Sequence, residues 1–360
     1  MTTDIVIPRI DLPFAVSQKH PLQDRLYPAT LEWARRFGLV TTEAAAERLR
    51  RYRLELCSYY APTVDSGPAL QLLTDWITWA VVFEDQIDEA TAGLRPNLLA
   101  PALDEFRAIL RDDPGMPAPS NPAVAALADL WKRTAPDSGP QWRQRFYDHV
   151  SDQFRAELRA SIHRATRTPM DTATCTELRA KTGWVTFTHD LQHHIHRVWV
   201  PDTVYCSTPY QTLLWSAADI LMWTNDLFSY TREAAFGELN NLAIVLRTEQ
   251  GLTPQQAVDR VHTMIDERVA DFVKAGRELP DLVRSLQLPP DALLAAEHGL
   301  THLRTLVRGS YDWHLRCERY HHGPDIAANL PTLDDLFGIT QDAPGANTEF
   351  SPAKERGQAK

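Results

Sequence analysis

The sequence lacks the features that mark secreted and membrane-spanning proteins. Its 360 residues include only four cysteines, widely separated and without a Cys-x-x-Cys pair: Cys57, Cys175, Cys206 and Cys317. Such a pattern argues against a disulfide scaffold, so we expect reduced thiols and a cytoplasmic protein. No apolar run reaches the roughly 20 residues that would span a bilayer, and residues 1–8 are too polar for a signal peptide. We therefore expect no membrane insertion.

An excess of positive charge is also absent. The chain carries 37 Lys and Arg residues against 47 Asp and Glu residues, which gives a formal net charge of -10. Because nucleic acids and anionic lipids are bound by basic surfaces, we expect neither as a partner. A polyanionic substrate would have to be bound through metal ions or through locally placed arginines.

There is no internal repeat, heptad array or block of period-two strands, and helical patterns dominate. With 44% hydrophobic residues the chain can fill one large core or two smaller ones, and its short proline-rich joints favour a single all-α domain. Residues 1–28 are punctuated by prolines and are predicted to form an extended arm. The helical domain is predicted over 29–335, and the polar segment 336–360 is predicted to be a disordered tail.

Apolar residues at steps of three and four predict the long helices of this domain. The clearest patterns cover residues 68–89, 142–162, 175–198 and 210–238. Thr253, Pro254 and Gln256 form the pattern of a capping box with proline at the first helical position, which predicts a helix from 254 towards 275. Residues 292–320 are predicted to form the last long helix.

The most specific motif is the run Asn-Asp-Leu-Phe-Ser-Tyr-Thr-Arg-Glu over residues 225–233. Asn225, Ser229 and Glu233 recur every four residues inside a helical pattern, so their side chains share one face. An amide oxygen, a hydroxyl and a carboxylate together suit Mg²⁺, which prefers hard oxygen ligands, and Arg232 beside them could bind a phosphate oxygen. The same spacing also fits polar positions on a solvated helix face.

A second acidic cluster ends the apolar run of the helix predicted over 68–89. Residues 84–89 read Glu-Asp-Gln-Ile-Asp-Glu, and Glu84 and Asp88 lie four residues apart on one helix face. Carboxylates this close repel one another unless water or cations screen them, which indicates a magnesium site. The alternative is a helix end that simply emerges into solvent.

Together the two motifs resemble the bacterial class I terpene synthase (terpene cyclase) family. In that family a DDxxD-like box after an aromatic residue and an NDxxSxxxE box hold a trinuclear magnesium cluster that binds the substrate diphosphate. The second box fits without exception, whereas the first has Glu84 where an aspartate is usual. Its metal ligands therefore stay open among Glu84, Asp85, Asp88 and Glu89. We expect Glu84 on the cavity side near Asp88, with Glu84→Gln abolishing turnover and Asp85→Asn tolerated.

Further residues extend the resemblance, which runs from about residue 13 to residue 320. Arg179 stands where the family has its diphosphate sensor, and Thr182 and Gly183 follow at the linker and effector positions. A helix interrupted near Gly183 could turn a free carbonyl towards the cavity, where it would stabilise developing positive charge. Trp313, His314 and the pair Arg319 and Tyr320 resemble the family's closing helix, whose Arg-Tyr pair donates hydrogen bonds to the diphosphate.

The resemblance implies a single-domain helical bundle around a central apolar cavity, three Mg²⁺ ions and an isoprenyl diphosphate substrate. Arg179, Arg232, Arg319 and Tyr320 would help the metals neutralise the diphosphate, and the cavity would shield the resulting allylic cation from water. Candidate wall residues are Trp79, Ala80, Phe83, Thr182, Trp184 and Trp313, with Phe187 and Trp223 as further aromatic candidates. The product would be a sesquiterpene from farnesyl diphosphate or, because Ala80 and Val81 are small, a diterpene from geranylgeranyl diphosphate. The oligomeric state is left open, and a homodimer is one of the alternatives.

Three rival functions remain open. A histidine-rich stretch, in which His189 and His193 share a helix face with Asp190 between them, could bind a transition metal in a phosphohydrolase. A linear prenyl-chain transferase is closer, but that family has aspartate-rich boxes at both sites, and Asn225 and Ser229 replace the second here. A non-catalytic helical scaffold would release no diphosphate from any isoprenyl substrate.

Overall fold

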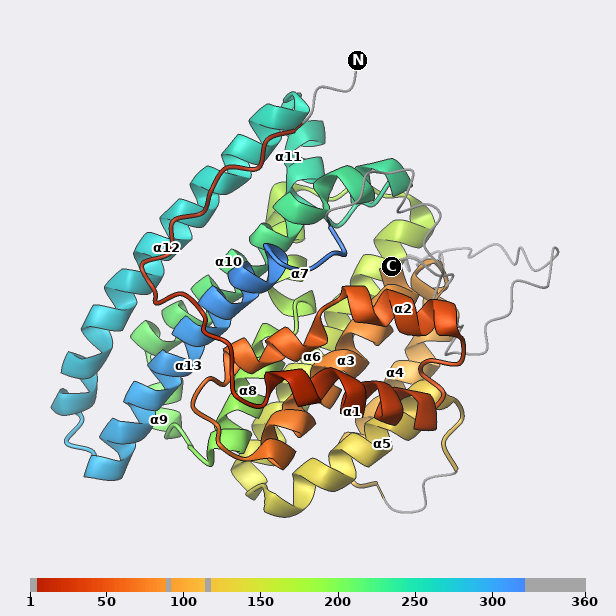
Figure 1. Cartoon of the computed structure of the whole chain (residues 1–360). Coiled ribbons are helices and arrows are strands. Elements are labelled where there is room, and N and C mark those ends of the chain that lie inside the picture. Colours follow the sequence, from red (N-terminus) through yellow and green to blue (C-terminus); the bar gives the residue numbers. More distant parts are fainter. Residues whose placement is uncertain (1–4, 89–91, 114–117, 321–360) are drawn as a thin grey trace, which may run out of the picture.

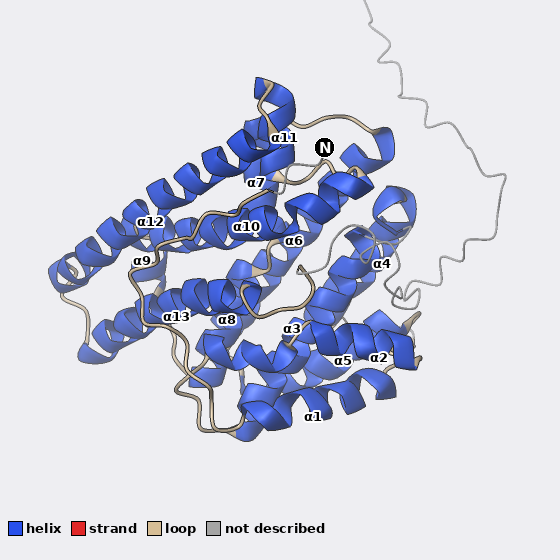
Figure 2. Ribbon diagram, turned by 45° about the horizontal axis from the view of Figure 1, so that its top comes forward, coloured by secondary structure: helices blue, strands red, loops and turns tan. Residues whose placement is uncertain are grey.

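The computed structural model describes residues 5–88, 92–113 and 118–320, and all regular secondary structure in these ranges is helical (Figures 1 and 2). The predicted all-α class is confirmed. Glu89 and the predicted tail 336–360 lie outside the described residues. No helix in the described ranges is both long and apolar enough to cross a membrane.

The N-terminal half of the chain contributes six α-helices and three short 3-10 helices to the described part. They are α1 (Gln23–Arg36), α2 (Glu43–Arg51), η1 (Leu54–Tyr60), α3 (Gly67–Asp88), η2 (Ala92–Leu94), α4 (Pro96–Leu110), α5 (Pro122–Thr134), η3 (Ala135–Asp137) and α6 (Pro140–Thr166). The C-terminal half follows with α7 (Thr172–Thr182), α8 (Val185–His196), α9 (Asp202–Tyr205), α10 (Thr208–Phe236), α11 (Leu242–Gln250), α12 (Pro254–Ser285) and α13 (Pro290–His314).

Most predicted helices are confirmed, with changes at their ends. The pattern over 175–198 divides into α7 and α8 at Gly183 and Trp184, as the expected interruption required. The capping box is present, because Thr253 accepts from Gln256 N and Gln256 reaches back to Thr253 N, but α12 continues to Ser285. The last helix ends at His314, so Arg319 and Tyr320 lie in the turns that follow it and not on a helix.

The N-terminal arm is shorter than predicted. It runs along α12 and α13 (Figure 1), where Val6 exchanges two hydrogen bonds with Gln255 and Ile10 N donates to Tyr311 Oη at 3.3 Å. The helix α1 begins at Gln23 and includes Pro28, which was assigned to the arm. Burying Leu26 and its neighbours against α3 outweighs the single helical hydrogen bond that this proline removes.

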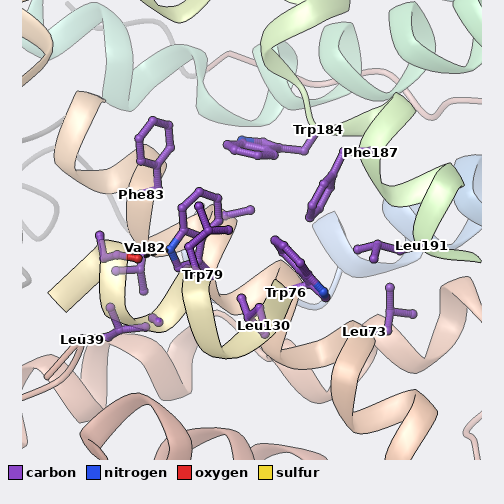
Figure 3. Close-up of a cluster of buried hydrophobic side chains, with 14 of the residues drawn as sticks. Leu39, Leu73, Trp76, Trp79, Val82, Phe83, Leu130, Trp184, Phe187 and Leu191 are labelled. Atoms are coloured by element: carbon purple, nitrogen blue, oxygen red, sulfur yellow. Dashed lines mark hydrogen bonds between the residues drawn. The ribbon is translucent and has the colours of Figure 1, made fainter. Parts of the chain in front are cut away.

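The core is divided into two groups of buried side chains. One lies among α1–α6 and α8 and is rich in aromatic rings, as Figure 3 shows for Trp76, Trp79, Phe83, Trp184 and Phe187. The other lies among α7 and α10–α13 and is mainly aliphatic. Some of the aromatic rings meet edge to face, such as Trp79 with Trp184 at 5.6 Å and 88°, and others stack, such as Trp79 with Phe83 at 5.5 Å and 13°.

A seam of buried histidines joins α8 to α13. His189 and His193 lie 4.2 Å apart by ring centroid, and His193 and His302 lie 5.5 Å apart. His189 Nε2 and Tyr210 Oη share a hydrogen bond of 2.8 Å. Burial lowers the pKa of His189 to about 3 and that of His302 to about 2, and it lowers the pKa of His193 as well. These imidazoles are therefore neutral in the folded protein.

Stability should fall on mild acidification because of this seam. A histidine whose pKa is near 6.5 unfolded and well below that folded favours the native state above pH 6.5, and that contribution is lost as pH falls towards the folded pKa. Each such histidine should lower the free energy of unfolding by about 1.4 kcal/mol for every pH unit below 6.5. Urea unfolding at pH 7.5, 6.5 and 5.5 should show a shallower loss for His302→Leu than for the wild type. Equal slopes would show that folding leaves the pKa of His302 unchanged, against the lowering expected from its burial.

Candidate functional site

A cavity of about 120 Å³ lies where the two parts of the core meet, and it has one polar end. Its lining residues are Leu54, Cys57, Tyr60, Ile77, Ala80, Val81, Glu84, Gly183, Trp184, Val185, Thr188, Leu221, Met222, Asn225, Leu306, Ser310, Trp313, His314, Arg319 and Tyr320. A wider hollow of about 760 Å³ lies between the start of α6 and the end of α8 but touches neither oxygen-rich motif. The smaller cavity is the candidate site because both motifs reach it.

The helix α10 carries the second motif as predicted, with Asn225, Ser229 and Glu233 on one face. Ser229 Oγ donates to the Asn225 carbonyl at 2.7 Å and accepts from Asn241 Nδ2 at 3.5 Å. The buried Asn241 caps α11 and donates from Nδ2 to Glu233 Oε2 at 2.9 Å and to the Asp226 carbonyl at 3.0 Å. Sequence reasoning missed Asn241, although its position as an N-cap eight residues after Glu233 was a usable signal.

Arg179 connects α7 to the same motif. Its Nη2 lies 2.6 Å from Asp226 Oδ1 and donates to Asn225 Oδ1 at 3.0 Å. Burial raises the pKa of Asp226 to about 7 although Arg179 opposes this. Arg232, also predicted to bind diphosphate, is nine-tenths buried and pairs with Glu233 at 3.9 Å. Both arginines therefore lie beside the second motif.

The acids at the end of α3 point in different directions. Glu84 lines the cavity and accepts a hydrogen bond from Trp184 Nε1 at 2.5 Å. Asp85 lies away from it and is held by Tyr52 Oη at 2.6 Å, Arg319 Nη2 at 2.9 Å and Arg48 Nη2 at 3.3 Å. The expectation that Glu84 is the cavity-facing acid agrees with this arrangement.

Asp88 lies against α6, in a charged group that sequence reasoning did not identify. Arg164 donates to Asp88 Oδ1 at 2.8 Å and pairs with Glu238 at 3.0 Å. Glu157, also on α6, is buried, and the nearby carboxylates of Glu84 and Asp88 add to burial in raising its pKa well above the usual range. Only the fold brings α6 beside the acidic end of α3.

The charges of these acids fit a bound divalent cation. Burial, reinforced by Asp88, raises the pKa of Glu84 to about 8, and burial raises that of Asp88 to about 6. A cation would relieve this repulsion, and the donors are carboxylate, amide and hydroxyl oxygens, which suit Mg²⁺. Arg179 Nε and Arg164 Nη1 are buried and have no hydrogen-bond partner among the described residues. These two cationic donors could bind an anion held by such a metal.

The segment after α13 closes the polar end of the cavity. Tyr320 Oη accepts from Asn225 Nδ2 at 2.8 Å, and its ring stacks on His314 at 5.2 Å. His314 donates from Nδ1 to the Ser310 carbonyl at 2.8 Å, and burial lowers its pKa to about 4. With Arg319 bound to Asp85, this segment links both motifs.

The break between α7 and α8 exposes one backbone carbonyl. The Thr182 carbonyl accepts from Gln153 Nε2 at 3.0 Å, and the Trp184 carbonyl accepts from Thr188 N at 2.9 Å. No described residue donates to the carbonyl between them, that of Gly183. Trp184 has φ +56°, a left-handed conformation that costs a non-glycine residue roughly 1–2 kcal/mol.

Adding a methyl group at Gly183 should disturb this break. A Cβ there would lie 2.1 Å from Met222 Sδ and 2.4 Å from Met222 Cγ, so the methionine would have to move. We expect Gly183→Ala to lower the free energy of unfolding by about 1–3 kcal/mol. Introduced into Met222→Ala, the same glycine substitution should cost much less in urea unfolding, because the side chain it would strike is gone. If Gly183→Ala alone leaves stability unchanged, the contact with Met222 is not a close one.

The predicted cavity wall is partly wrong. Ala80, Trp184 and Trp313 line the cavity, whereas Trp79, Phe83 and Thr182 do not. Trp79 and Phe83 pack against Trp184 in the aromatic core (Figure 3), where Trp79 Nε1 donates to the Ala123 carbonyl at 2.9 Å. The further candidates Phe187 and Trp223 are also absent from the lining. Aromatic chemistry favours these residues as cavity-wall candidates, but helix geometry turns their side chains away from the cavity.

The histidine-rich stretch does not support the phosphohydrolase alternative. Among the described residues no three His, Cys, Asp or Glu side chains are placed to hold a metal ion by themselves, either in this stretch or at the two oxygen-rich motifs, where amide, hydroxyl and phosphate oxygens would complete the ligand set. His189 and His193 instead face Tyr210 and His302 in the buried seam.

Comparison with known proteins gives consistent matches along the chain. Residues 75–271 match the family model described as terpene synthase family 2, C-terminal metal binding. Pentalenene synthase from Streptomyces avermitilis is 30% identical over 332 residues, which cover 91% of this chain and 97% of that protein. The (-)-beta-caryophyllene synthase ((2E,6E)-farnesyl diphosphate cyclizing) of Saccharothrix espanaensis is 30% identical over 334 residues, covering 91% and 93%. Wild-type cucumene synthase has a similar solved structure, with a TM-score of 0.73, 28% identity and coverage of 85% and 99%.

Proposed function

This chain belongs to the bacterial class I terpene synthase family, and from that premise we propose that it ionises farnesyl diphosphate with Mg²⁺ and cyclises it to a sesquiterpene. The reaction breaks the bond between the substrate's terminal carbon and the diphosphate oxygen. Diphosphate leaves with the bonding electrons, and the allylic cation closes into rings. The ring cation then loses a proton to give a hydrocarbon, or is captured by water and loses a proton to give an alcohol. Such an enzyme is a carbon-oxygen lyase acting on phosphates.

The observation that carries this function is the meeting of two distant motifs at one end of an apolar cavity. Glu84 and Asn225 both line that end, although they are 141 positions apart in the chain. Glu84 and Asp88 on one side, and Asn225, Ser229 and Glu233 on the other, would hold the metal ions. Three Mg²⁺ ions are proposed by analogy with the family.

Bound Mg²⁺ would supply the positive charge that makes diphosphate a good leaving group. Arg179, Arg319 and Tyr320 would donate hydrogen bonds to the diphosphate oxygens, since guanidinium and phenol groups are suitable donors. In the described arrangement Arg319 binds Asp85 and Tyr320 binds Asn225, so substrate binding would exchange internal contacts for contacts to diphosphate.

The rest of the cavity would protect the cation from water. Its walls are mainly apolar, and the rings of Trp184, Trp313 and Tyr60 offer π faces that stabilise positive charge. The Gly183 carbonyl, which accepts from no described residue, would add a fixed dipole near the ionising carbon.

Farnesyl diphosphate is favoured over geranylgeranyl diphosphate by the relatives of this chain. The Saccharothrix espanaensis and Roseiflexus castenholzii relatives are named as farnesyl diphosphate cyclizing synthases. The cavity of about 120 Å³ would have to widen for a chain of either length, so its volume does not separate the two substrates.

Incubation of the purified protein with Mg²⁺ and geranyl, farnesyl or geranylgeranyl diphosphate tests this function. We expect diphosphate release and a cyclic C15 hydrocarbon or alcohol, identified by mass spectrometry, from farnesyl diphosphate. Removing Mg²⁺ with a chelator should abolish both signals, and adding Mg²⁺ back should restore them. A C20 product would move the assignment to a diterpene cyclase, whereas a need for isopentenyl diphosphate would indicate a prenyl-chain transferase.

A further inference from the structure

Trp184 connects the first metal motif to the break between α7 and α8. Its indole Nε1 donates to Glu84 Oε1 at 2.5 Å, across 100 positions of sequence. The residue directly follows Gly183, and its backbone is in the left-handed region at φ +56°. A bulky residue in that conformation persists only where its surroundings hold it there, and such positions cluster at functional sites.

The ring of Trp184 has little freedom to move. Four aromatic rings contact it edge to face: Trp79 at 5.6 Å, Phe83 at 5.6 Å, Phe154 at 6.2 Å and Phe187 at 5.1 Å. Figure 3 shows Trp184 between Phe187 and the pair Trp79 and Phe83. The direction of the indole N–H is therefore set by the core and not by Glu84.

Glu84 is the more adjustable member of the pair. A glutamate side chain has one more rotatable bond than an aspartate, so its carboxylate has to be oriented before it can bind a metal at a fixed point. The indole N–H engages only Oε1, and no described residue donates a hydrogen bond to Oε2. The neighbouring Asp85 is held by Arg48, Tyr52 and Arg319 and cannot take this position without breaking those contacts.

We propose that Trp184 is a positioning residue for Glu84: its indole N–H orients the carboxylate so that Oε2 faces the metal, and thereby couples metal binding to the Gly183 break. This inference rests on the proposed function, because it assumes that Glu84 binds Mg²⁺. The pair accounts for a glutamate at the first position of the motif, since the longer side chain reaches the indole and the cavity together.

Binding of inorganic diphosphate in the presence of Mg²⁺ tests this role without substrate turnover. Calorimetry should show that Trp184→Phe, which keeps an aromatic ring but removes the N–H, binds about 10- to 100-fold more weakly, the usual effect of losing a partner of a metal ligand. Trp76→Phe is the matched control, because it removes another indole N–H of the same aromatic core, one that is donated to Thr134 Oγ1 and contacts neither Glu84 nor Trp184. Its thermal stability should fall while its Mg²⁺-dependent diphosphate binding stays at the wild-type value.

Indole N–H resonances of ¹⁵N-tryptophan-labelled protein give a second readout, with Trp184→Phe identifying the Trp184 signal. That signal should shift when Mg²⁺ and diphosphate are added together, and Glu84→Ala should shift it in the absence of both. The positioning role is wrong if Trp184→Phe binds diphosphate as tightly as the wild type. It is also wrong if the Trp184 indole N–H resonance does not shift in Glu84→Ala. If the wild type itself shows no Mg²⁺-dependent diphosphate binding, the proposed function fails first.

Discussion

Glu84→Gln should reduce turnover of farnesyl diphosphate by about 10³-fold or more, because a metal ligand that stabilises the leaving diphosphate is worth several kcal/mol. The substitution keeps the shape and the hydrogen bond from Trp184 Nε1 but removes the negative charge that faces the cavity. The folded structure should tolerate it, since burial raises the pKa of Glu84 to about 8 and a neutral side chain is already well accommodated without metal. Steady-state diphosphate release and thermal unfolding measure the two effects.

Asp85→Asn is the matched comparison on the adjacent position. Asp85 balances two buried arginines, Arg48 and Arg319, so the variant should lose about 3–5 kcal/mol of stability. Its folded fraction should still bind Mg²⁺ through Glu84, and turnover per folded molecule should fall much less than in Glu84→Gln. If Asp85→Asn is instead stable and inactive while Glu84→Gln remains active, the metal ligand is Asp85.

Arg179→Gln should lower both activity and stability. Arg179 is buried and bridges Asp226 Oδ1 at 2.6 Å and Asn225 Oδ1 at 3.0 Å, so its loss leaves a buried carboxylate unpaired. We expect the free energy of unfolding to fall by about 3–5 kcal/mol. Turnover should fall by about 10²- to 10³-fold, because the diphosphate loses a charged donor. Urea unfolding and steady-state diphosphate release from farnesyl diphosphate measure these effects.

Adding Asp226→Asn to Arg179→Gln separates the two effects. The double variant no longer has an uncompensated carboxylate, so stability should recover while turnover stays low. Recovery of activity together with stability would mean that Arg179 is only a structural partner of Asp226. If stability does not recover, Arg179 stabilises the fold through contacts other than this pair.

The sequence predicted the second motif well because its geometry is local. Asn225, Ser229 and Glu233 lie within nine residues of one helix, and helical spacing alone puts them on the same face. Helical spacing also separates Glu84 and Asp88 from Asp85. What spacing could not predict is the set of partners, because Arg48, Tyr52 and Arg319 reach Asp85 from three other segments of the chain.

The cavity wall could have been predicted better than it was. Once Glu84 is assigned to the cavity side of α3, residues three, four and seven positions before it share its face, and these are Val81, Ala80 and Ile77. All three line the cavity, whereas Trp79 and Phe83 lie on another face and pack into the core. No pattern in the sequence predicts the hydrogen bond between Trp184 and Glu84, since it depends on the left-handed backbone conformation of Trp184.

Crystals grown with Mn²⁺ in place of Mg²⁺ and with inorganic diphosphate offer the most direct test of the site. Anomalous scattering locates Mn²⁺ independently of any assumption about the ligands. We predict peaks at the polar end of the cavity, coordinated from one side by Glu84 or Asp88 and from the other by Asn225, Ser229 and Glu233, with diphosphate bridging them. Peaks confined to the histidine seam around His193 and His302, or none near residues 84–88, would contradict the account.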